Sequence, residues 1–313
     1  MKRLIVDFIL WFVWVPLRRL LKALPLSFSY FLAGLAADMA SFFPTARRAM
    51  VMEELRLLYG DRLSQAQVLC EARGAFRLFF KRQIENLLFS KFTGDAVKER
   101  VTIEGLENLD AVLARGKGAV MLLAHYGPFM IPLPALAYRG YRIMQLVGKP
   151  LHEEKRPIHR RIHEARVEES SSHPFEFVRT DNSLRPVLRG LAGNGIVVIA
   201  FDGLAGHKWT RVPLLDRIAE VSTGPFRLAS KSGAGIVPTF VIQEKGDRRR
   251  IVIHPEMQPG SAGDEDAAFA EQARQFGCLF ERYLEARPDH FAMTLDAHRR
   301  EAERGLTKPL FVA

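Results

Sequence analysis

Two titratable residues directly follow apolar runs that are typical of buried strands. His125 follows GAVMLLA and Asp202 follows GIVVIAF. Histidine titrates near neutral pH and acts as a general base, and a neighbouring carboxylate fixes its tautomer and increases its basicity. The carboxyl ends of parallel strands meet at one edge of a sheet, so we expect the two side chains to be neighbours. The alternative interpretation is a hydrogen-bonded loop histidine and an aspartate that caps a turn.

The sequence lacks the motifs of several other classes of enzyme and binding site. The sequence has no G-x-S-x-G nucleophile elbow, no P-loop and no G-x-G-x-x-G after a strand. His159 and His163 have the i, i+4 spacing of zinc ligands, but no third ligand is evident, so we expect no metal and no cofactor. The arginines around them form either a solvated helix face or a binding site for phosphate or an acidic carrier protein. Two cysteines exclude a disulfide framework.

The sequence after Val101 predicts alternating strands and helices, and these elements must position His125 and Asp202. Apolar runs predict strands at 118–124, 141–147, 195–201, 235–242 and 250–254. The segments predicted as helices are 106–115, 129–137, 155–167, 183–192, 222–232 and 264–287, the last ending at Pro288. This order predicts an α/β fold, with a mostly parallel sheet flanked by helices. Residues 202–221 are interpreted as a long loop.

The N-terminal residues favour a membrane surface. The run LIVDFILWFVWV at 4–15 is shorter than the roughly 20 apolar residues that span a bilayer, and a second apolar stretch follows at 24–36. Basic residues outnumber acidic ones over 1–48. We expect interfacial helices with the following residues at headgroup depth or facing lipid phosphates: Trp11, Trp14, Arg18, Arg19 and Lys22. Buried helices of a soluble domain are the alternative.

The net charge of +10 does not predict nucleic-acid binding, because the basic residues lie with apolar helices and not with stacking aromatics. A long helix is predicted from Ser64, a suitable N-cap, to Phe89. We divide the chain into a helical membrane-anchoring region at 1–92, an α/β domain at 93–300 and a C-terminal tail at 301–313.

Four blocks carry a resemblance to a known family. They are AHYGPFM at 124–130, IAFDG at 199–203, VPLLDRIAEVSTGPFRLASKSGAGIVP at 212–238 and RPDHFAMTLDAHRR at 287–300. In this order they resemble the bacterial lipid A secondary (lauroyl/myristoyl) acyltransferases. The resemblance implies a glycerolipid acyltransferase-like fold at the cytoplasmic face of the bacterial inner membrane. It also implies transfer of a fatty acyl chain from acyl carrier protein or coenzyme A to a hydroxyl of a glycolipid such as a lipid A precursor.

The resemblance implies that His125 deprotonates the acceptor hydroxyl, without a covalent acyl-enzyme. The family has an acid five residues after this histidine, where this chain has Met130. Asp202 matches a second acidic position of the family and is our preferred replacement; Glu220 is the alternative carboxylate. A third alternative is a non-catalytic homologue that binds lipid or acyl carrier protein, and a fourth is a lysophospholipid acyltransferase.

Further contacts are predicted around this pair. The resemblance places Arg160 or Arg161 on a phosphate or thioester oxygen, and Thr223 and Gly224 at a helix start that binds an anion. From its place in the predicted loop we add Arg211 as a substrate contact, and Gly127 as a point of close approach by substrate or backbone. We expect Phe129 and Met130 in the acyl channel.

Overall fold

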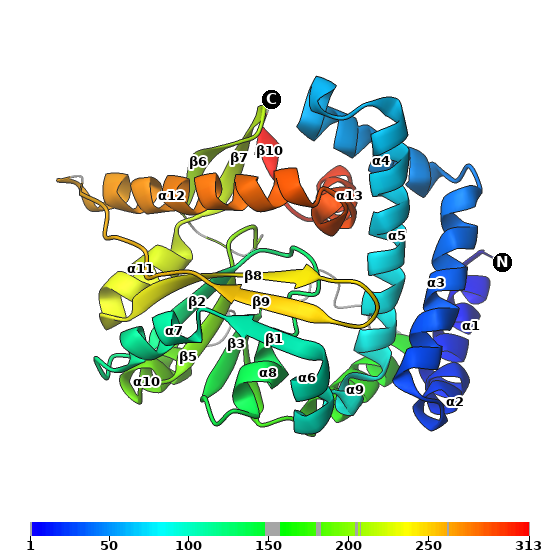
Figure 1. Cartoon of the computed structure of the whole chain (residues 1–313), viewed down its shortest axis with the longest axis horizontal. Coiled ribbons are helices and arrows are strands. Elements are labelled where there is room, and N and C mark those ends of the chain that lie inside the picture. Colours follow the sequence, from blue (N-terminus) through cyan, green and yellow to red (C-terminus); the bar gives the residue numbers. More distant parts are fainter. Residues whose placement is uncertain are drawn as a thin grey trace.

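The computed structural model describes residues 2–147, 157–179, 183–203, 206, 208–261 and 263–312. Figure 1 shows a central sheet with helices packed on both faces, and an N-terminal helical layer at one end of the molecule. The helices and short helical turns of that layer are α1 (Lys2–Phe12), η1 (Val13–Leu17), α2 (Arg18–Ala23), α3 (Leu26–Phe42), α4 (Ala46–Tyr59), η2 (Gly60–Arg62), α5 (Gln65–Leu87), η3 (Phe89–Lys91) and α6 (Gly94–Arg100).

The main sheet has seven strands in the order β1-β9-β8-β2-β5-β3-β4. Their bounds are β1 (Val101–Glu104), β2 (Ala119–Leu123), β3 (Ile143–Val147), β4 (Phe175–Arg179), β5 (Ile196–Ala200), β8 (Gly235–Gln243) and β9 (Arg249–Ile253). All neighbouring strands pair in parallel except β8 and β9. The α/β class and the mostly parallel sheet are therefore confirmed, and each of the five predicted strands is present.

The remaining helices are α7 (Leu106–Leu113), α8 (Pro132–Ala137), α9 (Pro157–Ser171), α10 (Arg185–Ala192), α11 (Gly224–Ser232), α12 (Glu265–Ala286) and α13 (Asp289–Glu303). They correspond to the predicted segments, with α13 in addition; the start of the segment predicted at 155–167 lies outside the described residues. Strand side chains alternate between the two faces of the sheet. Accordingly Val120 and Leu122 belong to one apolar core, and Met121 and Leu123 belong to the other.

The segment interpreted as a loop at 202–221 holds a β-hairpin, which corrects that prediction. Its strands β6 (Trp209–Leu214) and β7 (Arg217–Ser222) pair antiparallel, and β10 (Phe311–Val312) adds to β7. Helix α13 packs on α4 and α5, so the C-terminal part of the chain contacts the N-terminal helices. The division at 92/93 and 300/301 stays a prediction.

Several N-terminal side chains that we expected at the membrane surface pack against the rest of the protein instead. Trp14 is buried, and the Arg166 guanidinium lies 5.1 Å from its ring centroid. The carboxylate of Glu169 binds Arg18 at 2.5 Å and Lys22 at 2.6 Å. Glu169 also accepts hydrogen bonds from the backbone nitrogen of Ser90 (2.9 Å) and from its hydroxyl (2.6 Å). These basic residues therefore join the helical layer to α9, and of the predicted lipid-facing cations only Arg19 is exposed.

Apolar side chains of α1 and α3 nevertheless lie on the outside of the molecule. The large exposed ones on these two helices are Leu4, Ile5, Val6, Phe8, Ile9, Trp11, Phe12, Phe28, Phe31, Leu32, Leu35, Met39 and Phe42. We call them the α1/α3 apolar surface. Among the described residues no individual helix is long and apolar enough for a membrane span. The segments Leu26–Phe42 and Ala46–Arg62 have sufficient length and apolar composition only when they are taken together, and the chain bends by 82° between them.

Helix α5 is fixed to α3 and to the sheet through one buried ionic cluster. Its first turn is closed by a capping box between Ser64 and Gln67, which confirms the predicted N-cap. Near its other end, Glu85 pairs with the fully buried Arg249 of β9. The hydroxyl of Tyr30 lies 2.5 Å from Arg249 and donates to Glu85 at 3.2 Å. Three segments that are distant in sequence thus meet at one carboxylate.

We predict that Glu85→Ala lowers the free energy of unfolding by roughly 3–5 kcal/mol, because Arg249 is left as a buried charge without its carboxylate. Urea unfolding in detergent measures this change. Glu99→Ala is the matched control, since it removes a carboxylate that pairs with Arg100 at the surface. Equal effects of the two substitutions would contradict this role of the cluster.

Candidate active site

The register of the sheet brings His125 and Asp202 together. Leu123 of β2 pairs with Ala200 of β5, and each candidate residue lies two positions beyond its strand. The Asp202 carboxylate accepts a hydrogen bond from the backbone nitrogen of His125 at 2.9 Å, and the same oxygen lies 3.1 Å from His125 Nδ1. The predicted juxtaposition is therefore present at the carboxyl edge of the sheet.

The two side chains differ in exposure. Asp202 is 2% exposed, whereas the His125 side chain is 38% exposed. With Nδ1 donating to the carboxylate, Nε2 keeps its lone pair, and no described residue forms a hydrogen bond to it. The ring thus has one nitrogen fixed by the protein and one available to an incoming molecule.

The electrostatics of the pair favour a basic imidazole. Burial by itself lowers the pKa of His125, but the charge of Asp202 and the hydrogen bond to it raise the pKa above its ordinary value. Arg82 opposes this shift and Glu301 supports it. Burial disfavours the ionised form of Asp202, yet His125 and His298 hold the pKa of this carboxyl well below its usual range.

Sequence reasoning missed the contribution of α13. Nε2 of His298 lies 3.3 Å from the second oxygen of Asp202, and the Thr294 hydroxyl donates to the backbone carbonyl of His125 at 2.6 Å. Thr294 and His298 have i, i+4 spacing and so share one helix face. The i, i+4 spacing of these two polar residues, in the segment that follows Pro288, was the signal in the sequence that could have indicated this contribution.

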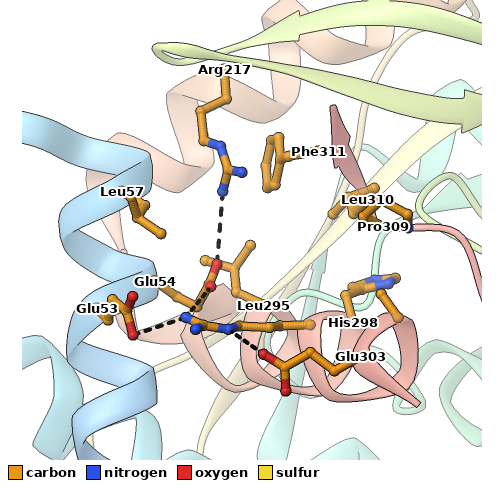
Figure 2. Close-up of a pocket in the computed structure, with 12 residues that line it drawn as sticks. Glu53, Glu54, Leu57, Arg217, Leu295, His298, Glu303, Pro309, Leu310 and Phe311 are labelled. Atoms are coloured by element: carbon orange, nitrogen blue, oxygen red, sulfur yellow. Dashed lines mark hydrogen bonds and ion pairs between the residues drawn. The ribbon is translucent and has the colours of Figure 1, made fainter. Parts of the chain in front are cut away.

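His298 also lines a cavity of about 310 Å³ (Figure 2). It is lined by Glu53, Glu54, Leu57, Arg217, Leu295, His298, Arg299, Ala302, Glu303, Pro309, Leu310 and Phe311. Its charges are paired: Arg299 lies 2.9 Å from Glu53 and 3.1 Å from Glu54, and Arg217 reaches Glu54 at 3.8 Å. In this cavity two arginines therefore face three carboxylates, and His298 links the cavity to Asp202.

Phe129 and Met130 lie next to the histidine and are both half-buried. The Phe129 ring packs edge-on against the imidazole, with 4.8 Å between ring centroids. Met130 packs against one of the two apolar cores. No acid from the histidine motif itself reaches His125.

Glu220, the alternative carboxylate, is not the partner of His125. It belongs to β7, where Arg211 lies 3.6 Å away and Lys308 lies 3.8 Å away. The Arg211 side chain is 71% exposed on β6. These two predicted residues therefore pair with each other across the hairpin.

At Gly127 the structure shows a close approach by backbone, one of the two approaches predicted there; its contact with substrate stays a prediction. It is buried with φ of +59°, and a Cβ atom there would lie 2.3 Å from the Val241 carbonyl oxygen. Its nitrogen donates to the His290 carbonyl at 3.0 Å. Only glycine fits so close to backbone at a positive φ.

The other predicted contacts lie on separate elements. Thr223 is the N-cap residue of α11 and is buried, with its nitrogen donating to the Lys208 carbonyl at 3.0 Å, while Gly224 is exposed. Arg160 and Arg161 are exposed on α9, where Arg160 pairs with Glu164 at 3.8 Å. Within the described part of the chain, none of these residues contacts His125 or Asp202, and no His, Cys, Asp and Glu cluster is arranged to hold a metal.

The chain matches the model of a known protein family. The family model described as bacterial lipid A biosynthesis acyltransferase matches residues 2–298, which is nearly the whole chain. The match includes all four sequence blocks except the end of the last one. No curated protein matches the sequence.

We predict that Asp202→Asn lowers the pKa of His125, because the negative charge that raises it is removed while the burial that lowers it remains. In an NMR titration of labelled histidine in detergent, the midpoint for this ring moves to lower pH. Glu220→Gln leaves the midpoint unchanged. An unshifted midpoint in Asp202→Asn would contradict the coupling.

Proposed function

We propose that this chain, which belongs to the bacterial lipid A biosynthesis acyltransferase family, moves a fatty acyl chain from a thioester to a hydroxyl of a membrane glycolipid. Family membership implies an acyltransferase. The donor that we propose is acyl carrier protein or coenzyme A, and the acceptor is a lipid A precursor. One observation carries the mechanism: Asp202 holds Nδ1 of His125, and Nε2 is left for the acceptor.

The reaction follows from this arrangement. Nε2 of His125 takes the proton of the acceptor hydroxyl while its oxygen attacks the thioester carbonyl carbon. The new C–O ester bond forms and the C–S bond breaks. The departing thiolate then takes the proton from the imidazolium, so the histidine returns to its neutral form. No acyl group is attached to the protein at any stage.

Asp202 supplies the carboxylate that Met130 does not. It stabilises the imidazolium that forms during attack, and His298 orients it from the other side. With an apolar residue at position 130, Phe129 and Met130 are proposed to line the path of the acyl chain. The exposed Arg160 and Arg161 are proposed to meet the acidic donor protein, as the basic face of α9 suits an acidic partner.

The α1/α3 apolar surface supports docking on the cytoplasmic face of the bacterial inner membrane. Phe8 is 62% exposed and Phe31 is 59% exposed, and Arg19 is exposed beside Leu20. Aromatic side chains with nearby cations are typical of helices that lie in the interface of an anionic membrane. Such docking places the site next to an acceptor that does not leave the bilayer.

We predict that His125→Ala lowers acyl transfer roughly 10²–10⁴-fold, the usual contribution of a general base. Transfer of radiolabelled acyl chains from carrier protein to a lipid A precursor measures the rate. Asp202→Asn also lowers the rate, whereas Glu220→Gln keeps it. If the wild-type protein transfers nothing to this or any lysophospholipid acceptor, the protein is a non-catalytic lipid-binding homologue.

We predict that the double substitution Phe8→Ser and Phe31→Ser weakens binding to vesicles of phosphatidylethanolamine and phosphatidylglycerol by at least about tenfold, because burial of one such side chain contributes roughly 1.5–3 kcal/mol. Co-sedimentation measures the partition coefficient. Ile218→Ser, on the exposed part of β7, is the control and keeps full binding. Unchanged binding of the double variant would refute docking through α1 and α3.

A further inference from the structure

Arg82 of α5 lies beside the active-site histidine without a polar partner. Its guanidinium is half-buried and lies 5.7 Å from the Phe129 ring centroid and 5.9 Å from that of Phe79. Within the described part of the chain it forms no hydrogen bond and no ion pair. Glu85, one turn further along α5, is engaged by Arg249 and Tyr30. A charge held between two aromatic faces and left without an anion is unusual for a structural arginine.

A second cation also lies over the ring of Phe79. The Arg47 guanidinium is 4.1 Å from the Phe79 centroid. Its carboxylate partner, the fully buried Asp296, lies 3.3 Å away and is shared with Arg300 at 2.8 Å. This cluster therefore holds three guanidinium groups and one carboxylate; the charge of Glu85 also acts on Arg82, but Glu85 is paired with Arg249.

The protein environment disfavours this excess charge. Burial lowers the pKa of Arg82; the charge of Glu85 opposes this shift, and the charge of Arg47 adds to it. Burial and Arg300 lower the pKa of Arg47, against the opposing effect of Asp296. Two desolvated cations that repel each other gain most from a ligand that carries more than one negative charge.

The Arg82 end of this cluster lies close to the His125 ring. Phe129 is in contact both with Arg82 and with the His125 imidazole, and the charge of Arg82 acts on the titration of His125. The other charged groups that act on the ring are Asp202 and Glu301. An anion held at Arg82 therefore lies near the His125 ring, with the Phe129 ring in contact with both.

We propose that Arg82, together with Arg47, binds a phosphate group of the substrate beside His125. Guanidinium groups present a planar fork that matches phosphate oxygens in two-point hydrogen bonds, and the excess of positive charge suits a dianionic phosphate monoester. The inference rests on the proposed function for the identity of the substrate. The phosphate belongs either to the lipid acceptor, as a dianionic monoester, or to the phosphopantetheine arm of the donor, which on a carrier protein is a singly charged diester, and the two sources are separable.

The test measures binding to the full-length protein in detergent, so that it does not depend on turnover. Three probes are titrated: a glycolipid with a phosphate monoester, the same glycolipid after dephosphorylation, and phosphopantetheine. The variants are Arg82→Gln, Arg82→Lys and the control Arg73→Gln. Arg73 lies on the same helix but pairs with Asp38 at the surface, where its side chain is 57% exposed.

We expect Arg82→Gln to weaken binding of the phosphorylated glycolipid by about tenfold or more, with no change for the dephosphorylated lipid. Arg82→Lys, which keeps the charge and loses the fork, gives a smaller loss and serves as the test if the glutamine variant does not fold. Arg73→Gln binds all probes as the wild type does. A loss confined to phosphopantetheine identifies the donor as the source of the phosphate.

Two results overturn the proposal. One is equal binding of the phosphorylated and dephosphorylated lipids by the wild type, together with wild-type affinity of Arg82→Gln for phosphopantetheine. The other is unchanged binding of every probe by both Arg82 variants. Selective phosphate binding by a protein that shows no acyl transfer contradicts the proposed function and leaves the phosphate site in place. Acyl transfer by a protein that shows no selectivity for phosphate contradicts the phosphate site and leaves the proposed function in place.

Discussion

The buried carboxylate of Asp202 is the constraint around which the site is organised. An ionised group that is 2% exposed requires several donors, and it receives them from the His125 backbone, the His125 ring and His298. These donors belong to different parts of the fold, since one follows β2 and the other lies on α13. Because Thr294 also binds the His125 carbonyl, α13 fixes both the carboxylate and the backbone of the base. The position of the imidazole thus depends on the ends of β2 and β5 and on α13 together.

The predictable part of this arrangement is the part that depends on local pattern. Apolar runs located β2 and β5, and parallel pairing then placed His125 next to Asp202. His298 was missed because the predicted helix ended correctly at Pro288, while the next helix begins at once after it. The hairpin β6–β7 was missed because β6 contains Pro213, and because the hairpin completes its sheet with β10, from the far end of the chain.

Long-range pairing also explains the errors at the N-terminus. Arg18 and Lys22 follow an apolar run, a pattern typical of cations at a membrane surface. Their carboxylate, Glu169, is 151 residues from Arg18 in the sequence, so no local pattern indicates the contact. In the fold this contact ties the helical layer to α9, as Glu85 and Arg249 tie it to the sheet. The apolar helices and the site are consequently parts of one packed structure.

The origin of the carboxylate has a consequence for how such chains are recognised by short motifs. A search that requires an acid five residues after the histidine finds Met130 and rejects the chain. The acid that reaches the imidazole comes from the neighbouring strand, 77 residues downstream. Proximity across adjacent strand ends, and not spacing along the polypeptide, is therefore the criterion by which divergent genes of this kind are best compared.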